Sequence, residues 1–251
     1  MTIHYNPFSL KGKTILITGA SSGIGKTTAI ECSKMGALVV ITGRDEDRLQ
    51  ETFGQLVGTG HQQYIADLSL ENELNSLVSD LPVLDGIVHA AGMVKVLPFP
   101  FISSNELMVT FSINFFAPVL LSQKLIKSGK IIKGGSVVFM SSISGSVIAS
   151  AGHSVYAASK GAVTAMVKGM AIDLAPKKIR VNSISPGMIE TPLIHNDRIT
   201  QGQLDEDKKH YPLKRYGKPE EIAFASIYLL SDASAWVTGT NLIIDGGFTL
   251  I

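Results

Sequence analysis

The chain has 251 residues, of which 45% are hydrophobic and 17% charged, so it is long and apolar enough to build a large buried core. Lysines and arginines number 22 against 21 aspartates and glutamates, which leaves no strong field to attract nucleic acid or an anionic membrane. One cysteine excludes an intrachain disulfide and a cysteine-rich metal site, and fits a reducing, cytoplasmic location. The apolar runs are strand-sized, well short of the ~20 residues that span a bilayer.

Apolar runs alternate with helix-period stretches along the whole chain. Strands are predicted at 14–18, 38–42, 62–66, 86–89, 136–140, 180–185 and 241–245. Helices are predicted at 23–35, 45–56, 70–81, 105–127, 154–174 and 219–230. Apolar strands that are each followed by a helix predict a doubly wound α/β fold, with a seven-stranded parallel sheet covered by helices on both faces. We expect one domain over residues 1–251, and a substrate lid at about 187–217 that is ordered mainly when a cofactor is bound.

A glycine-rich turn joins the first predicted strand to the first predicted helix. Gly19, Gly23 and Gly25 are spaced as G-x-x-x-G-x-G, with Ser21, Ser22 and Ile24 between them. Glycines let the backbone approach a pyrophosphate closely, and the helix N-terminus offers free N–H groups to it. The turn therefore predicts dinucleotide binding.

The end of the second strand predicts which dinucleotide is bound. Arg44 stands where such folds hold the adenosine ribose, and a guanidinium suits a 2′-phosphate. This favours NADP(H) over NAD(H). Asp45 keeps NAD(H) open, because its carboxylate reaches the ribose if the strand ends one residue later.

Tyr156 and Lys160 share one face of the long predicted helix, at i and i+4. A tyrosine has a pKa near ~10, and a neighbouring ammonium favours the phenolate, so Lys160 is expected to lower the pKa of Tyr156. Ser141 and Ser142 end the fifth strand, where a hydroxyl can bond a substrate carbonyl. Together with the glycine-rich turn, Tyr156 and Lys160 predict a catalytic site beside a bound nucleotide.

With these motifs in this order, the chain resembles the short-chain dehydrogenase/reductase superfamily in its single-domain branch, which has a Rossmann fold. The resemblance extends from Leu10 to Gly247 and includes the 89–92 segment, Asn114 and the Pro186-Gly187 pair. It implies an oxidoreductase that interconverts a ketone and a secondary alcohol, with catalytic residues Asn114, Ser142, Tyr156 and Lys160. The cofactor-binding residues that it implies are Gly19, Ser21, Ser22, Gly23, Ile24, Gly25, Arg44, Asp67, Leu68, Ala90, Ala91, Gly92, Tyr156, Lys160, Pro186, Gly187, Ile189 and Thr191.

The roles that the resemblance implies are specific. Tyr156 donates the proton, Lys160 binds the nicotinamide ribose, and Ser142 holds the substrate oxygen. Asn114 holds a water that links Lys160 to solvent. The chain departs from the family at His89-Ala90, where two asparagines are usual, so the bracing of the cofactor loop must come from elsewhere.

Substrate and assembly stay open at this point. The segment 93–101 is apolar and is expected to line the substrate cleft in part. The chain resembles 3-oxoacyl-(acyl carrier protein) reductases among subfamilies, which allows a small or a carrier-bound carbonyl substrate. The alternatives are an NAD-dependent alcohol or sugar dehydrogenase and a non-catalytic nucleotide sensor. A homotetramer is expected, and no metal. Small residues that suit close contact between subunits follow Tyr156, at Ala157, Ala158, Gly161, Ala162 and Ala165.

Overall fold

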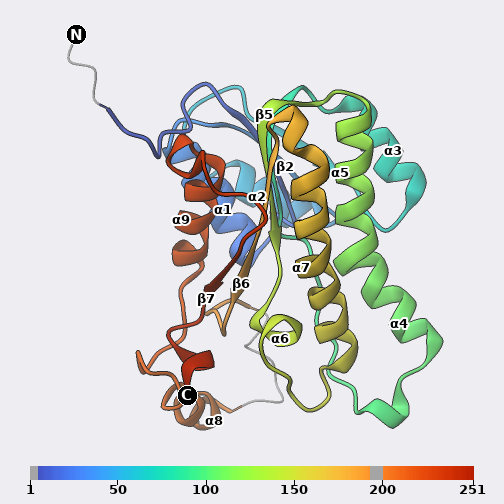
Figure 1. Ribbon diagram of the computed structural model, residues 1–251, viewed down its shortest axis with the longest axis vertical. Helices are drawn as coiled ribbons and strands as arrows, with labels where there is room; N and C mark the ends of the chain where they lie inside the picture. The colour runs from blue at the N-terminus through green and yellow to red at the C-terminus, as the bar shows by residue number, and fades with distance from the viewer. Residues whose placement is uncertain (1–4, 193–199) are drawn as a thin grey trace.

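Seven parallel strands form the centre of the molecule (Figure 1). The computed structural model describes residues 5–192 and 200–251. Its strands are β1 (Thr14–Thr18), β2 (Leu38–Gly43), β3 (Gln62–Ile65), β4 (Leu84–His89), β5 (Ile131–Met140), β6 (Arg180–Pro186) and β7 (Asn241–Ile244). Their order in the sheet is β3-β2-β1-β4-β5-β6-β7, and every pairing is parallel. The predicted doubly wound α/β fold with a seven-stranded parallel sheet is confirmed.

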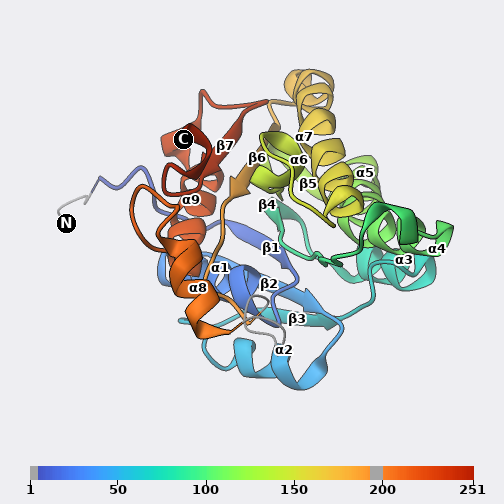
Figure 2. The same ribbon diagram turned by 90° about the horizontal axis from the view of Figure 1, so that it is seen from below.

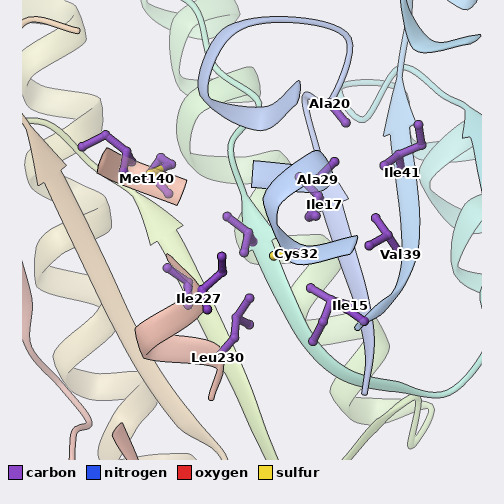
Figure 3. Close-up of a cluster of buried hydrophobic side chains, with 14 of the residues drawn as sticks. Ile15, Ile17, Ala20, Ala29, Cys32, Val39, Ile41, Met140, Ile227 and Leu230 are labelled. Carbon is purple, nitrogen blue, oxygen red and sulfur yellow. The ribbon is translucent and has the colours of Figure 1, made fainter. Parts of the chain in front are cut away.

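Helices cover both faces of the sheet because successive strand residues point to opposite sides. Ile15 and Ile17 pack on one face with α1 (Gly23–Lys34), α2 (Glu46–Phe53) and α9 (Pro219–Leu230), and part of this core is shown in Figure 3. Leu16 points to the other face, covered by α3 (Glu71–Asp80), α5 (Ala117–Lys127) and α7 (Ser154–Leu174). Burying one such side chain stabilises the fold by about 1.5–3 kcal/mol.

Several segments differ from their predicted secondary structure, and β5 begins at Ile131 rather than at the predicted residue 136. The single helix expected over 105–127 is α4 (Ser104–Phe111), a π-helical turn (Ser112–Phe116) and α5. A short turn, α6 (Ile143–Ser146), follows β5, and the expected lid segment contains α8 (Gln201–Lys208). Within the described residues, only the helical stretch Ser104–Lys127 has the length and hydropathy of a membrane span, and it packs on the sheet through Leu121 and Leu125.

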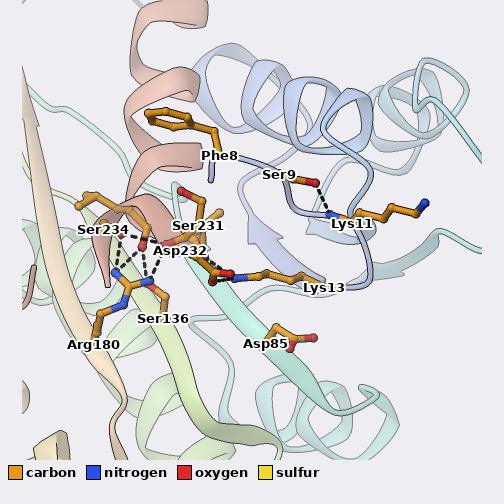
Figure 4. Close-up of polar contacts among 12 residues, drawn as sticks. Phe8, Ser9, Lys11, Lys13, Asp85, Ser136, Arg180, Ser231, Asp232 and Ser234 are labelled. Atoms are coloured by element: carbon orange, nitrogen blue, oxygen red, sulfur yellow. Dashed lines mark hydrogen bonds and ion pairs between the residues drawn. The ribbon is translucent and has the colours of Figure 1, made fainter. Parts of the chain in front are cut away.

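The amino end of the sheet is held by cations at the C-terminus of α9 (Figure 4). Arg180, the first residue of β6, donates to the Leu229 carbonyl and to the Ser234 hydroxyl, both at 2.7 Å. Lys13 binds the Asp232 carboxylate at 2.6 Å. A helix leaves its last carbonyls unpaired and carries negative partial charge there, so these cations stabilise the end of α9. The opposite, carboxyl edge is left for the loops seen end-on in Figure 2.

Candidate active site

A cavity of about 300 Å³ opens at the carboxyl edge of the sheet, where β1 lies between β2 and β4. The chain turns in opposite directions from β1 at this point, and open α/β sheets bind ligands in such a crevice. Most residues predicted to bind the cofactor line it: Gly19, Ser21, Ser22, Gly23, Ile24, Gly25, Arg44, Asp67, Leu68, Ala90, Ala91, Gly92 and Thr191. Residues predicted from segments far apart in the sequence therefore come together around one cavity.

The glycine-rich turn has the form that a bound pyrophosphate requires. A Cβ on Gly19 would lie 2.6 Å from the Ala91 backbone, and one on Gly25 would lie 2.3 Å from the Gly19 carbonyl, so neither position accepts a side chain. Ser22 precedes α1 without making a side-chain cap, and the first turn of α1 carries no acidic residue. The free N–H groups and the positive end of the helix dipole therefore face the cavity unopposed, which fits a dinucleotide phosphate.

Arg44 and Asp67 lie at the same wall of the cavity, joined by a 3.4 Å ion pair. The Arg44 side chain is 64% exposed, so this pair is weak and can be exchanged for another anion. Burial disfavours the ionised form of Asp67, but hydrogen bonds from the Ser69 hydroxyl and N–H and the Arg44 guanidinium outweigh it, so the pKa of Asp67 is lowered. Asp67 is an oriented anion beside a solvated guanidinium.

Asp45 caps the next helix. Its carboxylate accepts the Arg48 N–H at 3.0 Å and the Arg48 Nε at 2.8 Å, and these bonds lower the pKa of Asp45. β2 ends at Gly43, one residue beyond its predicted end, but the Asp45 carboxylate is held by Arg48. Arg48 lines the cavity as well, although the sequence reasoning missed it. Its spacing of four residues from Arg44 was the available signal.

The loop after β4 is braced without the asparagine expected at position 90. Ala91 donates its N–H to the Thr18 hydroxyl at 3.2 Å. Asn114 clamps the Met93 backbone, accepting its N–H at 2.8 Å and donating to its carbonyl at 2.9 Å. These two contacts supply the bracing that Ala90 cannot.

His89 fills the space beneath this loop as a neutral side chain. It lies 2.7 Å from the Ser122 hydroxyl and stacks on Phe139 at 4.7 Å between ring centres. Its Nδ1 is buried and has no partner among the described residues. Burial lowers the pKa of His89 to about 3, which keeps a charge out of the core below the cofactor loop.

The π-helical turn places Asn114 in the centre of the site. Asn114 is buried, and its amide also donates to the Ser159 hydroxyl at 3.1 Å. Pro118 follows four residues later and has no N–H to give to the Asn114 carbonyl. π-turns of this kind are frequent at functional sites. The arrangement leaves an acceptor where the resemblance implied a bound water.

Tyr156 and Lys160 lie on one turn of α7, with the Lys160 Nζ 5.9 Å from the centre of the Tyr156 ring. Lys160 is 5% exposed and donates to the Met140 carbonyl at 2.7 Å. Burial lowers the pKa of Lys160 to about 8. Burial also raises the pKa of Tyr156, and a hydrogen bond from Ser142 works in the opposite direction. The expected lowering of the Tyr156 pKa by Lys160 is absent from this arrangement, in which the ammonium is turned to Met140.

The two neighbouring serines separate into different roles. Ser141 is buried and donates to the Lys160 carbonyl at 2.9 Å, so it supports α7 from below. Ser142 donates to Tyr156 and accepts the Ser144 N–H at 3.1 Å, so its hydroxyl is the serine hydroxyl that faces the tyrosine. His153 is half-buried, with its ring centre 6.4 Å from that of Tyr156.

The remaining predicted residues lie on the far side of the site. Pro186 ends β6, and Gly187 donates to the Ile244 carbonyl of β7 at 2.9 Å. Ile189 forms a bridge with Gly217, which closes the base of the expected lid. Thr191 sits 3.3 Å from where a Gly23 Cβ would stand. The lid interval is described except at 193–199, which lies outside the described residues.

The chain is similar to one known protein family, to two named enzymes and to one solved structure. The model of the family described as enoyl-(acyl carrier protein) reductase matches residues 19–249. An NAD-dependent glycerol dehydrogenase of Listeria innocua is 34% identical over 97% of this chain and 96% of its own length. A 3-oxoacyl-[acyl-carrier-protein] reductase of Rickettsia felis is 31% identical over 96% and 99%. The crystal structure of a short-chain type dehydrogenase/reductase from Mycobacterium marinum superposes with a TM-score of 0.88, at 33% identity and 98% of each chain.

Proposed function

The chain belongs to the short-chain dehydrogenase/reductase superfamily of oxidoreductases that act on CH–OH groups, and from this premise we propose that it interconverts a ketone and a secondary alcohol with NADP(H). One observation carries the proposal. Ser142, Tyr156 and Lys160 converge beside the cavity, with a hydrogen bond from Ser142 to Tyr156 and the Lys160 ammonium at 5.9 Å from its ring.

The proposed roles follow from what each group can do. A bound nicotinamide supplies or accepts the hydride. In reduction, the Tyr156 hydroxyl donates its proton to the carbonyl oxygen, and Ser142 donates a hydrogen bond to that same oxygen. Lys160 has a pKa of about 8 and keeps much of its charge at neutral pH, which favours the phenolate left behind. Asn114 orients the cofactor loop and offers a carbonyl for the water that exchanges protons with Lys160.

Arg44 supports NADP(H) as the cofactor. Its exposed guanidinium lines the cavity and can exchange Asp67 for a 2′-phosphate, while Asp45 is engaged by Arg48 and does not compete for the ribose. NAD(H) is the alternative. It has support in the similarity to a glycerol dehydrogenase named for NAD, whereas the similarity to an acyl-carrier-protein reductase leaves a carrier-bound substrate open.

The proposal also covers the location, the assembly and the lid of the enzyme. We place the enzyme in the cytoplasm as a homotetramer, with the segment at about 187–217 acting as the lid. A spaced basic run that could attract an acidic carrier, Lys124, Lys127, Lys130 and Lys133, lies near the start of β5, where Lys130 donates to the Leu81 carbonyl. This is the amino edge of the sheet, opposite the cavity. We therefore interpret these lysines as a solvated surface rather than as a docking site for a carrier protein.

A panel of ketones and their alcohols tests the proposal, followed by the absorbance of the reduced nicotinamide with NADPH and NADH in parallel. The expected result is turnover of at least one pair, with a lower KM for NADPH. Tight NADPH binding without turnover of any pair would instead favour the non-catalytic nucleotide sensor. Turnover with NADH alone would favour an NAD-dependent alcohol or sugar dehydrogenase.

A further inference from the structure

A chain of side-chain contacts runs from the substrate-binding serine to the edge of the sheet. The Ser146 Oγ donates to the Ser142 carbonyl at 2.5 Å and lies 3.2 Å from the Ser185 Oγ. Ser185 is fully buried in β6 and donates to the Asn241 Oδ1 at 2.8 Å. Asn241 is the first residue of β7, the edge strand. Nothing in the proposed reaction requires Ser146, Ser185 or Asn241 to touch substrate or cofactor.

We propose that Ser146 is a positioning residue, which holds the Ser142 hydroxyl against Tyr156 and is itself fixed by Ser185 and Asn241. This inference rests on the proposed function, because it concerns the group that orients the proton donor. It extends the site by three side chains that the resemblance did not point to.

The backbone around Ser142 explains why such a support is needed. Ser144 and Gly145 lie inside the short α6 turn but have non-helical dihedrals, and Gly145 has φ +90. The regular helical backbone is therefore interrupted two residues after Ser142. Ser146 bridges this interruption by bonding back to the Ser142 carbonyl and, at 3.4 Å, to that of Ile143.

The loop is also fixed from the side of α7. A Cβ on Gly145 would lie 1.9 Å from the Ala157 carbonyl, and one on Gly161 would lie 2.9 Å from the Gly145 carbonyl. Gly161 and the Ala157 carbonyl therefore receive α6 of the same chain, and the expected role of these small residues in contacts between subunits stays a prediction. Packing sets the distance between loop and helix, and the hydroxyl chain holds the Ser142 carbonyl and so the backbone from which its side chain extends.

Few groups other than Ser142 act on the Tyr156 phenol. Lys160 on α7 is turned to Met140, and the His153 ring lies 6.4 Å away, with its Nδ1 3.0 Å from the Ala151 carbonyl. Among the residues that the structure describes, Ser142 is the group whose hydrogen bond lowers the pKa of Tyr156. A change in the orientation of Ser142 must therefore change the proton affinity of Tyr156.

Titration of the Tyr156 phenol by its ultraviolet absorbance tests this without substrate or cofactor. The signal is the difference between each protein and the same protein carrying Tyr156→Phe. Ser142→Ala sets the full effect, and Ser146→Ala tests the support. Ser150→Ala is the matched control, since Ser150 is an exposed serine in the same loop. We expect Ser146→Ala to raise the midpoint by about 0.5 unit, a threefold change in the equilibrium. Ser146→Thr keeps the hydroxyl and should restore it.

The titration separates the positioning role of Ser146 from the proposed enzymatic function. A Ser146→Ala midpoint equal to that of Ser150→Ala overturns the positioning role, as does a Ser142→Ala protein with no shift at all. If Ser146→Ala does not fold, Ser185→Ala replaces it, with a smaller shift in the same direction expected. A shifted titration in a protein that turns over no ketone refutes the proposed function alone, whereas turnover with an unshifted titration refutes the positioning alone.

Discussion

Lys160 donates to the Met140 carbonyl at 2.7 Å while its Nζ stays 5.9 Å from the centre of the Tyr156 ring. The ammonium is thus tethered to the end of β5, one helical turn from the phenol. The i, i+4 spacing of Tyr156 and Lys160 suggests that Lys160 both supplies the charge and contacts the phenol, but the structure divides these two roles between two residues. Lys160 brings a positive charge to the site, and Ser142 makes the direct contact with the hydroxyl.

Replacing Tyr156 by Phe removes the only proposed proton donor. The variant should still bind NADPH, because the phenol is not part of the cavity wall at the glycine-rich turn. Ketone reduction should fall by roughly 10²–10⁴-fold, the usual size of a general-acid contribution. Steady-state rates and NADPH binding by fluorescence measure both quantities. Tyr5→Phe, at an 88% exposed position, is the control. Near-normal activity in Tyr156→Phe would refute the proton-donor role.

Replacing Arg44 by Ala should change the preference between the two dinucleotides. The guanidinium is proposed to bind the 2′-phosphate, so the KM for NADPH should rise about tenfold, equivalent to about 1.4 kcal/mol, while the KM for NADH stays constant. Arg48→Ala should have a smaller effect, since Arg48 is already bound to Asp45. An unchanged KM for NADPH in Arg44→Ala would contradict the proposal that Arg44 binds the 2′-phosphate.

His89 makes the stability of the protein depend on pH below neutrality. Burial lowers its folded pKa from 6.5 to about 3, so the unfolded chain binds a proton in this interval that the folded one rejects. The stability contribution is complete above pH 6.5 and is lost as pH falls toward 3, at up to about 1.4 kcal/mol per unit.

His89→Asn keeps a hydrogen-bonding side chain but does not titrate. Its free energy of unfolding in urea, measured at steps across this interval, should fall less steeply with acid than that of the wild type. His210→Gln, at an exposed position, should keep the wild-type slope. Equal slopes in His89→Asn and wild type would show that His89 is not neutral and buried as described.

Arg180 should contribute strongly to stability although it is remote from the cavity. Its guanidinium donates to the carbonyls of Leu229 and Ser231 and to the Ser234 hydroxyl, and its loss removes all three bonds at the end of α9. Arg180→Ala should lower the free energy of unfolding by about 2–4 kcal/mol, measured by urea denaturation. Lys13→Ala should cost less, because its partner Asp232 is 81% exposed. The reverse order would contradict this account of the helix end.

The proposed tetramer predicts a single sedimenting species of four chains at micromolar concentration. Leu120, Phe116 and Met108 leave apolar surface exposed along α4 and α5, which a subunit contact would cover. Leu120→Asp should shift the distribution to smaller species, whereas Thr59→Asp, on an exposed loop, should not. A wild-type protein that sediments only as a monomer would count against the assembly.

The fold and the cavity wall were predictable because they depend on patterns with a fixed period or spacing. The seven apolar strands and the Gly19–Gly25 turn are of this kind, and both are in place. The π-turn at Asn114 was not predictable, because it inserts one residue into a stretch whose periodicity reads as a single helix. The engagement of Asp45 by Arg48 and the Ser146 contact depend on side-chain rotamers, which no local pattern encodes.

The missing Cβ at Gly145 restricts how the substrate range of this enzyme can be changed. Because Gly145 of α6 packs directly on the Ala157 carbonyl of α7, a side chain at position 145 would push apart the elements that carry Ser142 and Tyr156. Engineering for a new ketone should therefore leave residues 142–146 untouched. Sequence diversity in a library belongs instead at exposed apolar positions outside this loop, such as Val96 and Met188.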